Sequence, residues 1–298
     1  MTTELGGILT ALTTPFTAEG KLDVPALRAH VDRSIGGGVD GVVVCGSTGE
    51  FAALTTVERR QAVETVVSHV DGRVPVVAQT GATSTAEAIA LSRHAEAAGA
   101  DVLMPVTPFY EPISLAETTA YLRDVAASVD IPVMIYNIPA ATGVNIDAST
   151  AGALAREVDN IRYIKDSSAN WEQALQLIHH HSEHLGTFIG WDSYIFSALV
   201  EGAAGAVAGA ASVVPAELAS IRRAVASGDI ATAREDWRRV YPVIDGLITL
   251  PFFAAIKATL RELGAPVGAP RAPVSAIAED DARRLAALVA DLRPNSLA

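Results

Sequence analysis

The sequence predicts an α/β fold: a closed (β/α)8 TIM barrel with a C-terminal helical extension. Short apolar runs recur along the chain, each followed by a longer amphipathic stretch, as in parallel strands that are covered on both faces. Eight such runs are present, which fits a closed barrel better than an open sheet. The near-copies Gly38-Val39-Asp40-Gly41 and Gly99-Ala100-Asp101 indicate a repeating unit. No G-x-G-x-x-G signature follows the first run, which weakens the dinucleotide-binding open sheet further.

The predicted strands are apolar runs bounded by glycine, proline or polar turns. In chain order they span residues 8–12, 41–45, 74–78, 101–105, 132–136, 161–165, 187–190 and 205–209. The predicted helices between them span residues 24–35, 56–70, 85–98, 114–128, 147–157, 170–182 and 193–201. Thr55 and Ser84 each stand three residues before a glutamate, a spacing typical of the capping box at the start of a helix.

The strand pattern stops near residue 225. Residues 230–245, 250–263 and 278–291 have helical patterns instead, and the segment 264–273 between them is rich in proline and glycine. We therefore expect a barrel that carries the functional site over residues 1–225, and C-terminal helices packed on it over residues 226–298.

The composition limits the classes of function. The formal net charge of -12 argues against nucleic acid as a partner, because binding to phosphates depends on basic residues that displace counterions. The single cysteine, Cys45, lies in an apolar run, excludes an internal disulfide and favours a reducing cytoplasm. No signal-peptide pattern begins the chain, and no apolar run reaches the length of a membrane span. We expect a cytoplasmic protein with no membrane partner.

Lys165 is the first candidate for chemistry. The chain has only three lysines, Lys21, Lys165 and Lys257, among its 22 basic residues. Lys165 ends the apolar run 161–165, and barrel enzymes place their chemistry at the carboxyl ends of strands. An amine in apolar surroundings loses hydration, which favours the neutral form that attacks a carbonyl carbon. A structural lysine that snorkels past apolar neighbours or pairs with Asp166 is the alternative.

Two further groups stand at predicted strand ends. Tyr136 ends the run 132–136, and neighbouring strands of a sheet lie roughly 4.8 Å apart, so its hydroxyl could pass the protons that imine formation requires. A core tyrosine with a satisfied hydroxyl is the alternative. The turn Gly46-Ser47-Thr48-Gly49-Glu50 follows the second run, and the amides and hydroxyls of such a turn can hold a carboxylate. A plain glycine-rich connection is the alternative.

Five segments together resemble the dihydrodipicolinate synthase/N-acetylneuraminate lyase family of Schiff-base-forming barrels. They are Leu12-Thr13-Thr14-Pro15-Phe16, the 46–50 turn, Thr107-Pro108-Phe109-Tyr110, Tyr136-Asn137-Ile138-Pro139 and the strand that ends at Lys165. The resemblance implies a class I lyase or aldolase in which Lys165 forms a Schiff base with pyruvate or another 2-oxo acid. It also implies that no metal or organic cofactor is required.

The resemblance assigns roles to individual residues. The expected catalytic residues are Lys165, Tyr136, Thr48 and Tyr110. Tyr110 is expected to reach in from a neighbouring subunit of a homodimer or homotetramer. The expected substrate-binding residues are Ser47, Thr48, Val207, Gly190 and Asp192.

Two departures from the family pattern bear on the substrate. The synthase branch has an arginine two residues after the proline of its tyrosine–asparagine motif, where this chain has Ala141. The sialic-acid lyase branch has an acidic pair after the seventh strand, where this chain has Asp192-Ser193. We therefore expect a 2-keto-3-deoxy sugar acid or a 4-hydroxy-2-oxo acid as the substrate. The alternatives are 4-hydroxy-tetrahydrodipicolinate synthesis, dehydration or deamination by the same imine chemistry, and a non-catalytic regulatory barrel that binds a 2-oxo acid.

Two polar groups are interpreted as structural. The histidines at 179–181 and 184 lack a carboxylate–histidine arrangement on other elements, so no metal site is expected there. Glu50 is expected to brace its turn or start the next helix rather than act as a general base.

Overall fold

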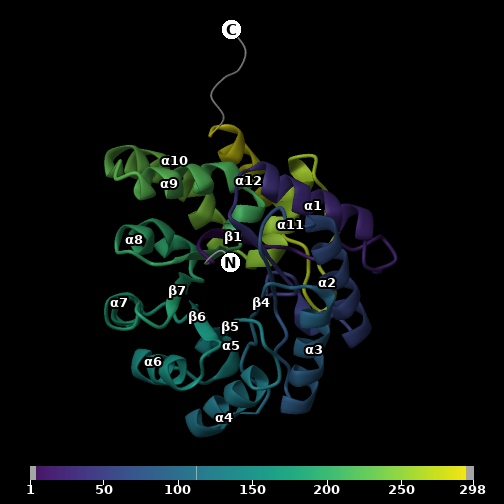
Figure 1. Cartoon of the computed structure of the whole chain (residues 1–298). Coiled ribbons are helices and arrows are strands. Elements are labelled where there is room, and N and C mark those ends of the chain that lie inside the picture. Colours follow the sequence, from purple (N-terminus) through teal and green to yellow (C-terminus); the bar gives the residue numbers. More distant parts are fainter. Residues whose placement is uncertain (1–4, 112, 293–298) are drawn as a thin grey trace. The chain divides into compact units, whose positions relative to one another are not determined.

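The computed structural model describes residues 5–111 and 113–292. In these residues eight parallel strands follow one another around a closed barrel, in the order β1 to β8, with helices between them (Figure 1). Further helices follow β8. The predicted (β/α)8 barrel with a C-terminal helical part is therefore confirmed.

The strands are β1 (Gly7–Ala11), β2 (Gly41–Val44), β3 (Val76–Ala78), β4 (Val102–Leu103), β5 (Val133–Asn137), β6 (Ile161–Asp166), β7 (Gly186–Ile189) and β8 (Gly205–Ala208). The α-helices are α1 (Val24–Gly36), α2 (Thr56–Val70), α3 (Thr85–Ala98), α4 (Leu115–Ala126), α5 (Pro139–Thr142), α6 (Ala148–Glu157), α7 (Trp171–His180), α8 (Ile195–Val200), α9 (Pro215–Ala226), α10 (Ile230–Ile248), α11 (Phe252–Glu262) and α12 (Glu279–Ala290). Short 3-10 helices are η1 (Phe51–Ala53), η2 (Asp192–Tyr194) and η3 (Ala210–Ser212).

The differences from the predicted elements have local causes. Helix α9 was not predicted; it begins at Pro215, which suits a first helical turn because proline has no N–H to satisfy there. Strand β4 is shorter than the predicted 101–105, since Pro105 cannot donate to a neighbouring strand, although its carbonyl still accepts from the Tyr136 N–H at 3.3 Å. Thr55 forms the predicted capping box with Glu58, and Ser84 accepts from the Glu87 N–H.

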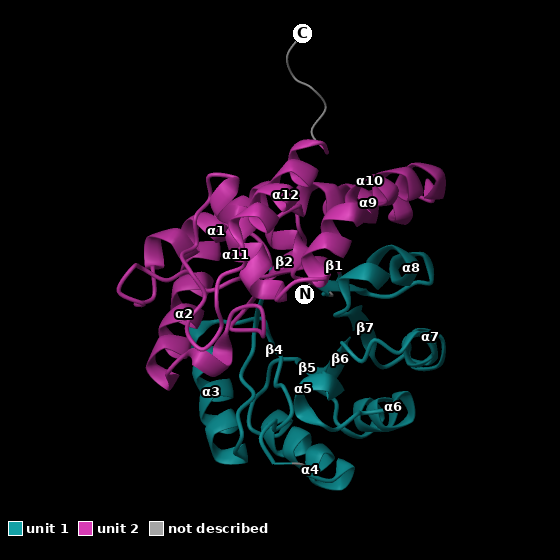
Figure 2. Ribbon diagram, turned by 180° about the vertical axis from the view of Figure 1, so that it is seen from behind, with its two compact units in different colours: residues 1–6, 75–207 teal, residues 7–74, 208–298 magenta. Residues whose placement is uncertain are grey.

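The chain divides into two compact units (Figure 2). Unit 1 consists of residues 1–6 and 75–207, and unit 2 of residues 7–74 and 208–298. The C-terminal helices thus belong to the same unit as the first two strands. The boundary near residue 225 stays a prediction.

The core of unit 1 is the sheet formed by β3 to β7 and the start of β8. Its strands are buried almost throughout, and Met134, Ile135 and Ile164 have no exposed surface. Such continuously apolar strands need cover on both faces, so they are typical of a parallel sheet wrapped by helices. The register of β5 and β6 pairs Tyr136 with Lys165 and Asn137 with Asp166.

Unit 2 packs α9 to α12 with β1, β2, α1 and α2. Residues of the C-terminal helices such as Val243, Ile244 and Leu285 are completely buried, so these helices are part of a core. Among the described residues no single helix meets the length and hydropathy expected of a membrane span; α10 and α11, bent by 119° at their junction, meet it only as a pair.

Candidate active site

Lys165 and Tyr136 form a buried pair at the carboxyl ends of β6 and β5. The strand register sets them side by side, and the Lys165 Nζ lies 4.0 Å from the centre of the Tyr136 ring. Only 5% of Lys165 and 2% of Tyr136 is exposed. An amine over an aromatic ring that carries a hydroxyl combines a nucleophile with a group able to exchange protons. The structure therefore brings together the two residues on which the predicted chemistry depends most.

Gly190, at the end of β7, makes room for the lysine side chain. A Cβ atom on this residue would lie 2.7 Å from the Lys165 Cε and 2.0 Å from the Ser167 Oγ, closer than real Cβ contacts. Its N–H donates to the Asp166 carbonyl at 2.8 Å, so the backbone position is fixed by β6. Glycine is required here because the backbone approaches the lysine closely.

The Asp166 carboxylate accepts hydrogen bonds from three neighbouring side chains. Asn137 Nδ2 and Gln173 Nε2 donate to its Oδ1 at 2.9 and 3.1 Å, and the Ser168 Oγ donates to its Oδ2 at 2.8 Å. Burial raises the pKa of the Asp166 carboxyl, while these hydrogen bonds act in the opposite direction. Within the described residues the Asp166 carboxylate is hydrogen-bonded to these three side chains and forms no ion pair with Lys165.

The other two lysines have different surroundings. Lys21 is exposed. Lys257, in α11, is 1% exposed and forms a buried ion pair with Glu50, and its Nζ also donates to the Ala269 carbonyl at 3.2 Å. Burial lowers the pKa of Lys257, against the opposing effect of the Glu50 carboxylate. An ammonium held this way has little freedom to attack a substrate.

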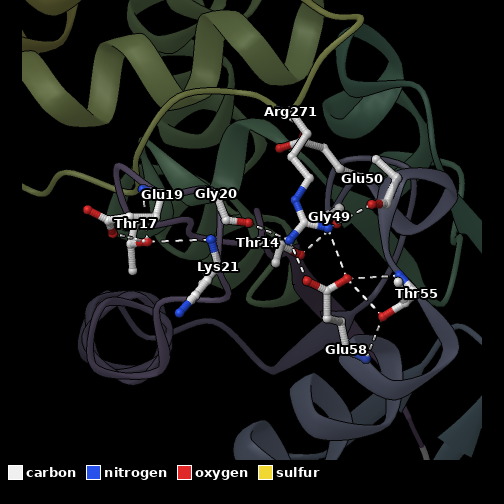
Figure 3. Close-up of polar contacts among 11 residues, drawn as sticks. Thr14, Thr17, Glu19, Gly20, Lys21, Gly49, Glu50, Thr55, Glu58 and Arg271 are labelled. Carbon is white, nitrogen blue, oxygen red and sulfur yellow. Dashed lines mark hydrogen bonds and ion pairs between the residues drawn. The ribbon is translucent and has the colours of Figure 1, made fainter.

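The turn Gly46–Glu50 follows β2 in unit 2, and its backbone is tightly folded. Cys45 and Glu50 have left-handed φ values of 58° and 56°. The Gly49 N–H donates to the Gly46 carbonyl and the Glu50 N–H to the Ser47 carbonyl, both at 3.0 Å, while the Thr14 hydroxyl donates to the Gly49 carbonyl at 2.6 Å (Figure 3). Thr48 within this turn is 8% exposed. The turn is thus held from inside and by the segment that follows β1.

Glu50 braces this turn against the C-terminal part of unit 2, in line with its expected role. One carboxylate oxygen pairs with Lys257 and the other accepts the Arg271 N–H at 2.9 Å. The Arg271 guanidinium forms a two-point ion pair with Glu58 in α2 (Figure 3). The Lys257 Nζ and the Arg271 Cζ each lie 4.2 Å from the centre of the Phe16 ring. We call Phe16, Glu50, Glu58, Lys257 and Arg271 the bracing cluster.

A pocket of about 410 Å³ opens beside the turn within unit 2. Ser47, Glu50 and Arg271 supply its polar lining. The remaining lining residues are Phe51, Ala52, Ala53, Phe253, Ala272, Pro273 and Val274. Ser47 therefore borders an open space rather than the packed core.

The remaining predicted site residues lie on strand ends and loops of unit 1. Val207 is on β8 and Asp192 opens η2 after β7, and their exposures are 2% and 5%. Tyr110 lies on the loop after β4 and is 83% exposed in the single chain. Trp191, between Gly190 and Asp192, is 36% exposed.

His179 lies at the surface and Cys45 in the interior of the fold. Within the part of the chain that the structure describes, no cluster of three or more His, Cys, Asp or Glu side chains could hold a metal ion. The Nε2 of His179 lies 3.1 Å from the Glu201 carboxylate at the surface. Cys45 is buried, and burial raises the pKa of its thiol to about 12, which disfavours the nucleophilic thiolate.

Comparison with known proteins decides the family. The model of the dihydrodipicolinate synthetase family matches residues 4–292. The chain belongs to this family. As a member of the dihydrodipicolinate synthetase family it is a carbon–carbon lyase of the Schiff-base-forming, pyruvate-aldolase type, which confirms the resemblance seen in the sequence.

Relatives with this fold span nearly the whole chain. A 4-hydroxy-tetrahydrodipicolinate synthase of Desulforudis audaxviator is 37% identical over 289 residues, which cover 97% of this chain and 98% of that protein. An uncharacterised DapA-like lyase of Halobacterium salinarum is 38% identical over 288 residues, covering 97% of this chain and 94% of that protein. YagE, a prophage protein of the same family from Escherichia coli K12 whose structure is in complex with pyruvate, is 34% identical. Its TM-score is 0.92, with coverage of 96% of this chain and 98% of that chain.

Proposed function

We propose that Lys165 forms an imine with the carbonyl carbon of pyruvate or another 2-oxo acid, and that the enzyme uses it to cleave or form a carbon–carbon bond with an aldehyde. The observation that carries this proposal is the Lys165 Nζ, buried and 4.0 Å from the Tyr136 ring. The complex of YagE with pyruvate supports a 2-oxo acid as the ligand class.

Cleavage of a substrate begins with attack on its carbonyl group. The Lys165 nitrogen attacks the carbonyl carbon, and the carbinolamine loses water to leave a cationic imine. The hydroxyl group next to the breaking carbon–carbon bond then gives up its proton to Tyr136, and the electron pair of that bond moves into the imine, which leaves an enamine and the free aldehyde. Protonation of the enamine regenerates an imine. Hydrolysis of this imine releases the smaller 2-oxo acid, such as pyruvate, and the free amine of Lys165. Tyr136 passes the protons at each stage, because its ring lies against the amine.

The remaining roles follow the family pattern. Ser47 and Thr48 bind the substrate carboxylate through their hydroxyls and the amides of their turn. Thr48 continues the proton relay with Tyr110, while Gly190, Val207 and Asp192 border the substrate. The bracing of the turn by Glu50 supports this assignment, since a site for a carboxylate needs donors in fixed positions.

Tyr110 favours a homo-oligomer, a dimer or tetramer in which this residue completes the site of a neighbouring copy. A tyrosine that is 83% exposed in the single chain leaves its ring uncovered by its own fold. Mixing a Tyr110→Phe enzyme with a Lys165→Ala enzyme would restore part of the activity only if one site uses both subunits. A cytoplasmic location stays a prediction from the sequence.

Ala141 and Ser193 shape our proposal for the substrate. Ala141 is exposed in the short helix α5 and offers no cation to a second carboxylate, and Ser193 leaves Asp192 without an acidic neighbour. A guanidinium that forms two hydrogen bonds to a carboxylate binds it strongly. The absence of such a guanidinium therefore weakens the binding of an aldehyde that carries a carboxylate. A 2-keto-3-deoxy sugar acid or a 4-hydroxy-2-oxo acid is the proposed substrate. Trp191 and Asp192 are the candidates for contacts to its tail.

The imine is tested by trapping. The enzyme is incubated with pyruvate and borohydride, digested, and its peptides are analysed by mass spectrometry. We expect the reduced adduct on the peptide that contains Lys165 and no adduct in Lys165→Ala. Labelling confined to Lys21 or Lys257 would contradict the assignment.

A further inference from the structure

Directly behind the catalytic pair lies a group of five hydrogen-bonded polar side chains, which we call the amide–carboxylate cluster: Asn137, Asn145, Asp166, Ser168 and Gln173. Asn137, Asp166 and Gln173 are 1%, 3% and 4% exposed, whereas Asn145 is exposed. They come from the ends of β5 and β6, the loop before α6, the loop between β6 and α7, and α7 itself. Buried polar groups destabilise a fold unless they are hydrogen-bonded. A network in which the buried members are all hydrogen-bonded therefore indicates a specific structural role.

The cluster joins the two strands at the residues that follow Tyr136 and Lys165. Asn137 and Asp166 are partners in the β5–β6 register, and the Asn137 Nδ2 donates to the Asp166 Oδ1 at 2.9 Å. Because side chains alternate along a strand, this bond lies on the face of the sheet opposite Tyr136 and Lys165. The Ser167 N–H continues the pairing with the Asn137 carbonyl at 2.8 Å. The strand ends are therefore tied one residue beyond the catalytic pair.

The same cluster ties down the loop that carries Ala141. The Asn137 Oδ1 accepts the Ile146 N–H at 3.0 Å, and its Nδ2 also donates to the Asn145 Oδ1 at 2.9 Å. Asn145 Nδ2 in turn donates to the Gln173 Oε1 at 2.8 Å. The loop from β5 to α6 thus returns to the strand end where it began.

The hydrogen bonds around Asp166 all run in one direction, towards its carboxylate. Its three side-chain partners, Asn137, Ser168 and Gln173, all donate to it, as an ionised carboxylate requires. A second carboxylate at position 137 would face it at hydrogen-bond distance, and like charges so close cannot both stay ionised at low cost.

We propose that Asn137, Asp166 and Gln173 are positioning residues for imine formation: by tying the ends of β5 and β6 they hold the Lys165 amine against Tyr136. This inference rests on the proposed function of Lys165. None of the three needs to touch the substrate. They act through the strand ends, and a displacement of about 1 Å in such a site can slow a reaction by roughly 10²-fold.

A reversal of polarity tests the proposal. Asn137→Asp sets two carboxylates face to face, and Gln173→Glu does the same from α7. Asp166→Asn removes the opposing charge, and its amide can donate where Asp166 accepted, because aspartate and asparagine have the same shape and side-chain amides can turn over. Asn137→Asp/Asp166→Asn therefore rebuilds the network with reversed donors and acceptors.

The matched control is Asn160→Asp at the other end of the same strand pair. The Asn160 Nδ2 donates to the carbonyls of Ala126 and Val129 at 2.9 and 3.1 Å, just before β6 begins. Asn160→Asp likewise places a carboxylate against groups that can only accept hydrogen bonds, here two carbonyl oxygens. Residue 160, however, lies at the opposite end of β6 from Lys165. This variant measures what a loss of stability alone does to the reaction.

The measurement is the rate of borohydride trapping of pyruvate at Lys165, at a temperature where circular dichroism shows each variant folded. We expect the maximal rate to fall by roughly 10²-fold in Asn137→Asp, with little change in the half-saturating pyruvate concentration, because Ser47 and Thr48, to which we assign the carboxylate, are unchanged. Asp166→Asn should restore the rate in both Asn137→Asp and Gln173→Glu, and Asn160→Asp should react like the wild type.

A folded Asn137→Asp enzyme with the wild-type rate, or a double variant as slow as Asn137→Asp, would overturn the positioning role. If Asn137→Asp does not fold, the pair of Gln173→Glu with and without Asp166→Asn decides the question by the same criteria. Absence of an adduct in the wild type is a separate outcome: it overturns the proposed function itself.

Discussion

At the scale of single residues, the surroundings of Lys165 separate it from the other two lysines. Its amine lies against a tyrosine ring, whereas Lys257 is paired with a buried carboxylate and Lys21 is exposed. Gly190 leaves the space that its side chain occupies. Reactivity here therefore depends on packing as much as on the type of residue.

Gly190→Ala should obstruct the catalytic lysine. The added Cβ would lie 2.7 Å from the Lys165 Cε, so the side chain must move away from its position over Tyr136. We expect imine trapping to slow by about ten-fold or more. Gly186→Ala on the same strand is the control, because its Cβ would crowd the Tyr163 ring instead, at 2.8 Å. Equal trapping rates in the two variants would refute this role of Gly190.

Tyr136→Phe should remove the proton carrier and keep the ring. We expect a folded protein whose turnover falls on the order of 10²–10⁴-fold. Tyr163→Phe is the matched control: that tyrosine lies on β6, where its hydroxyl accepts the Leu5 N–H at 3.2 Å. Near-normal turnover in Tyr136→Phe would mean that another group carries the proton.

His30 should make the protein sensitive to acid. Its Nε2 accepts the Thr13 N–H, and burial, helped by the charges of Arg33 and Lys257, lowers its pKa to about 3. The unfolded chain therefore binds a proton below about pH 6.5 that the folded protein does not.

Because the folded pKa of His30 is depressed, its contribution to stability is complete above about pH 6.5 and is lost as the pH falls towards 3. We expect a slope of up to about 1.4 kcal/mol per pH unit in the free energy of unfolding over this window. Urea unfolding measured over a series of pH values should show a smaller slope for His30→Gln than for the wild type. An unchanged slope in His30→Gln would contradict the assignment.

At the scale of elements, the bracing cluster connects the turn after β2 with α2, α11 and the segment before α12. Gly268 in that segment has a φ of 73°, and a Cβ there would lie 2.0 Å from the Phe16 carbonyl oxygen. The C-terminal helices of unit 2 thus contribute directly to the shape of a turn that we assign to substrate binding.

Lys257→Met should strongly destabilise the protein, because it leaves the Glu50 carboxylate buried at 2% side-chain exposure without its partner. We expect a loss of about 3–5 kcal/mol in the free energy of unfolding. Glu50→Gln/Lys257→Met should lose less than the sum of the two single variants, since no buried charge remains. Arg261→Met, in an exposed ion pair with Glu262 on the same helix, should cost about 0–1 kcal/mol. If the loss of unfolding free energy in the double variant equalled the sum of the losses in the two single variants, Glu50 and Lys257 would not be energetically coupled.

At the scale of the whole molecule, family membership and substrate are separate questions. The barrel and the imine that we propose at Lys165 are compatible with different second substrates, because function depends on the site rather than on the fold. Position 141 and the residues after β7 are where this chain departs from the two best-known branches.

Condensation of pyruvate with aspartate semialdehyde should be weak, because Ala141 offers no cation to the second carboxylate. We expect a kcat/KM below about 10⁴ M⁻¹s⁻¹, under the usual enzyme range, and higher activity with a 2-keto-3-deoxy sugar acid or 4-hydroxy-2-oxoglutarate. A panel of substrates followed by pyruvate consumption or release measures this. Ala141→Arg is the matched variant and should raise activity towards aspartate semialdehyde. A wild-type value above the limit would show that another cation replaces the arginine.

The order of the eight strands, most of the helices between them, and the pairing of Tyr136 with Lys165 could be predicted from the sequence alone. Hydrophobic periodicity and turn residues are local properties, and neighbouring strands of a parallel barrel bring their carboxyl ends together whatever the side chains. The family motifs are also local, so Ser47, Thr48 and Tyr110 could be assigned without a structure.

The bracing cluster and the amide–carboxylate cluster were decided only by the tertiary structure. Arg271 and Glu58 are 213 residues apart, and Asn145 and Gln173 are 28 apart. Nothing in the local sequence names such partners, because a single polar residue is equally compatible with solvent, a turn or a buried bond. Gly190 is similar: its need for glycine comes from the Lys165 side chain on another strand. Which polar groups meet is a consequence of packing, and packing is a property of the whole fold.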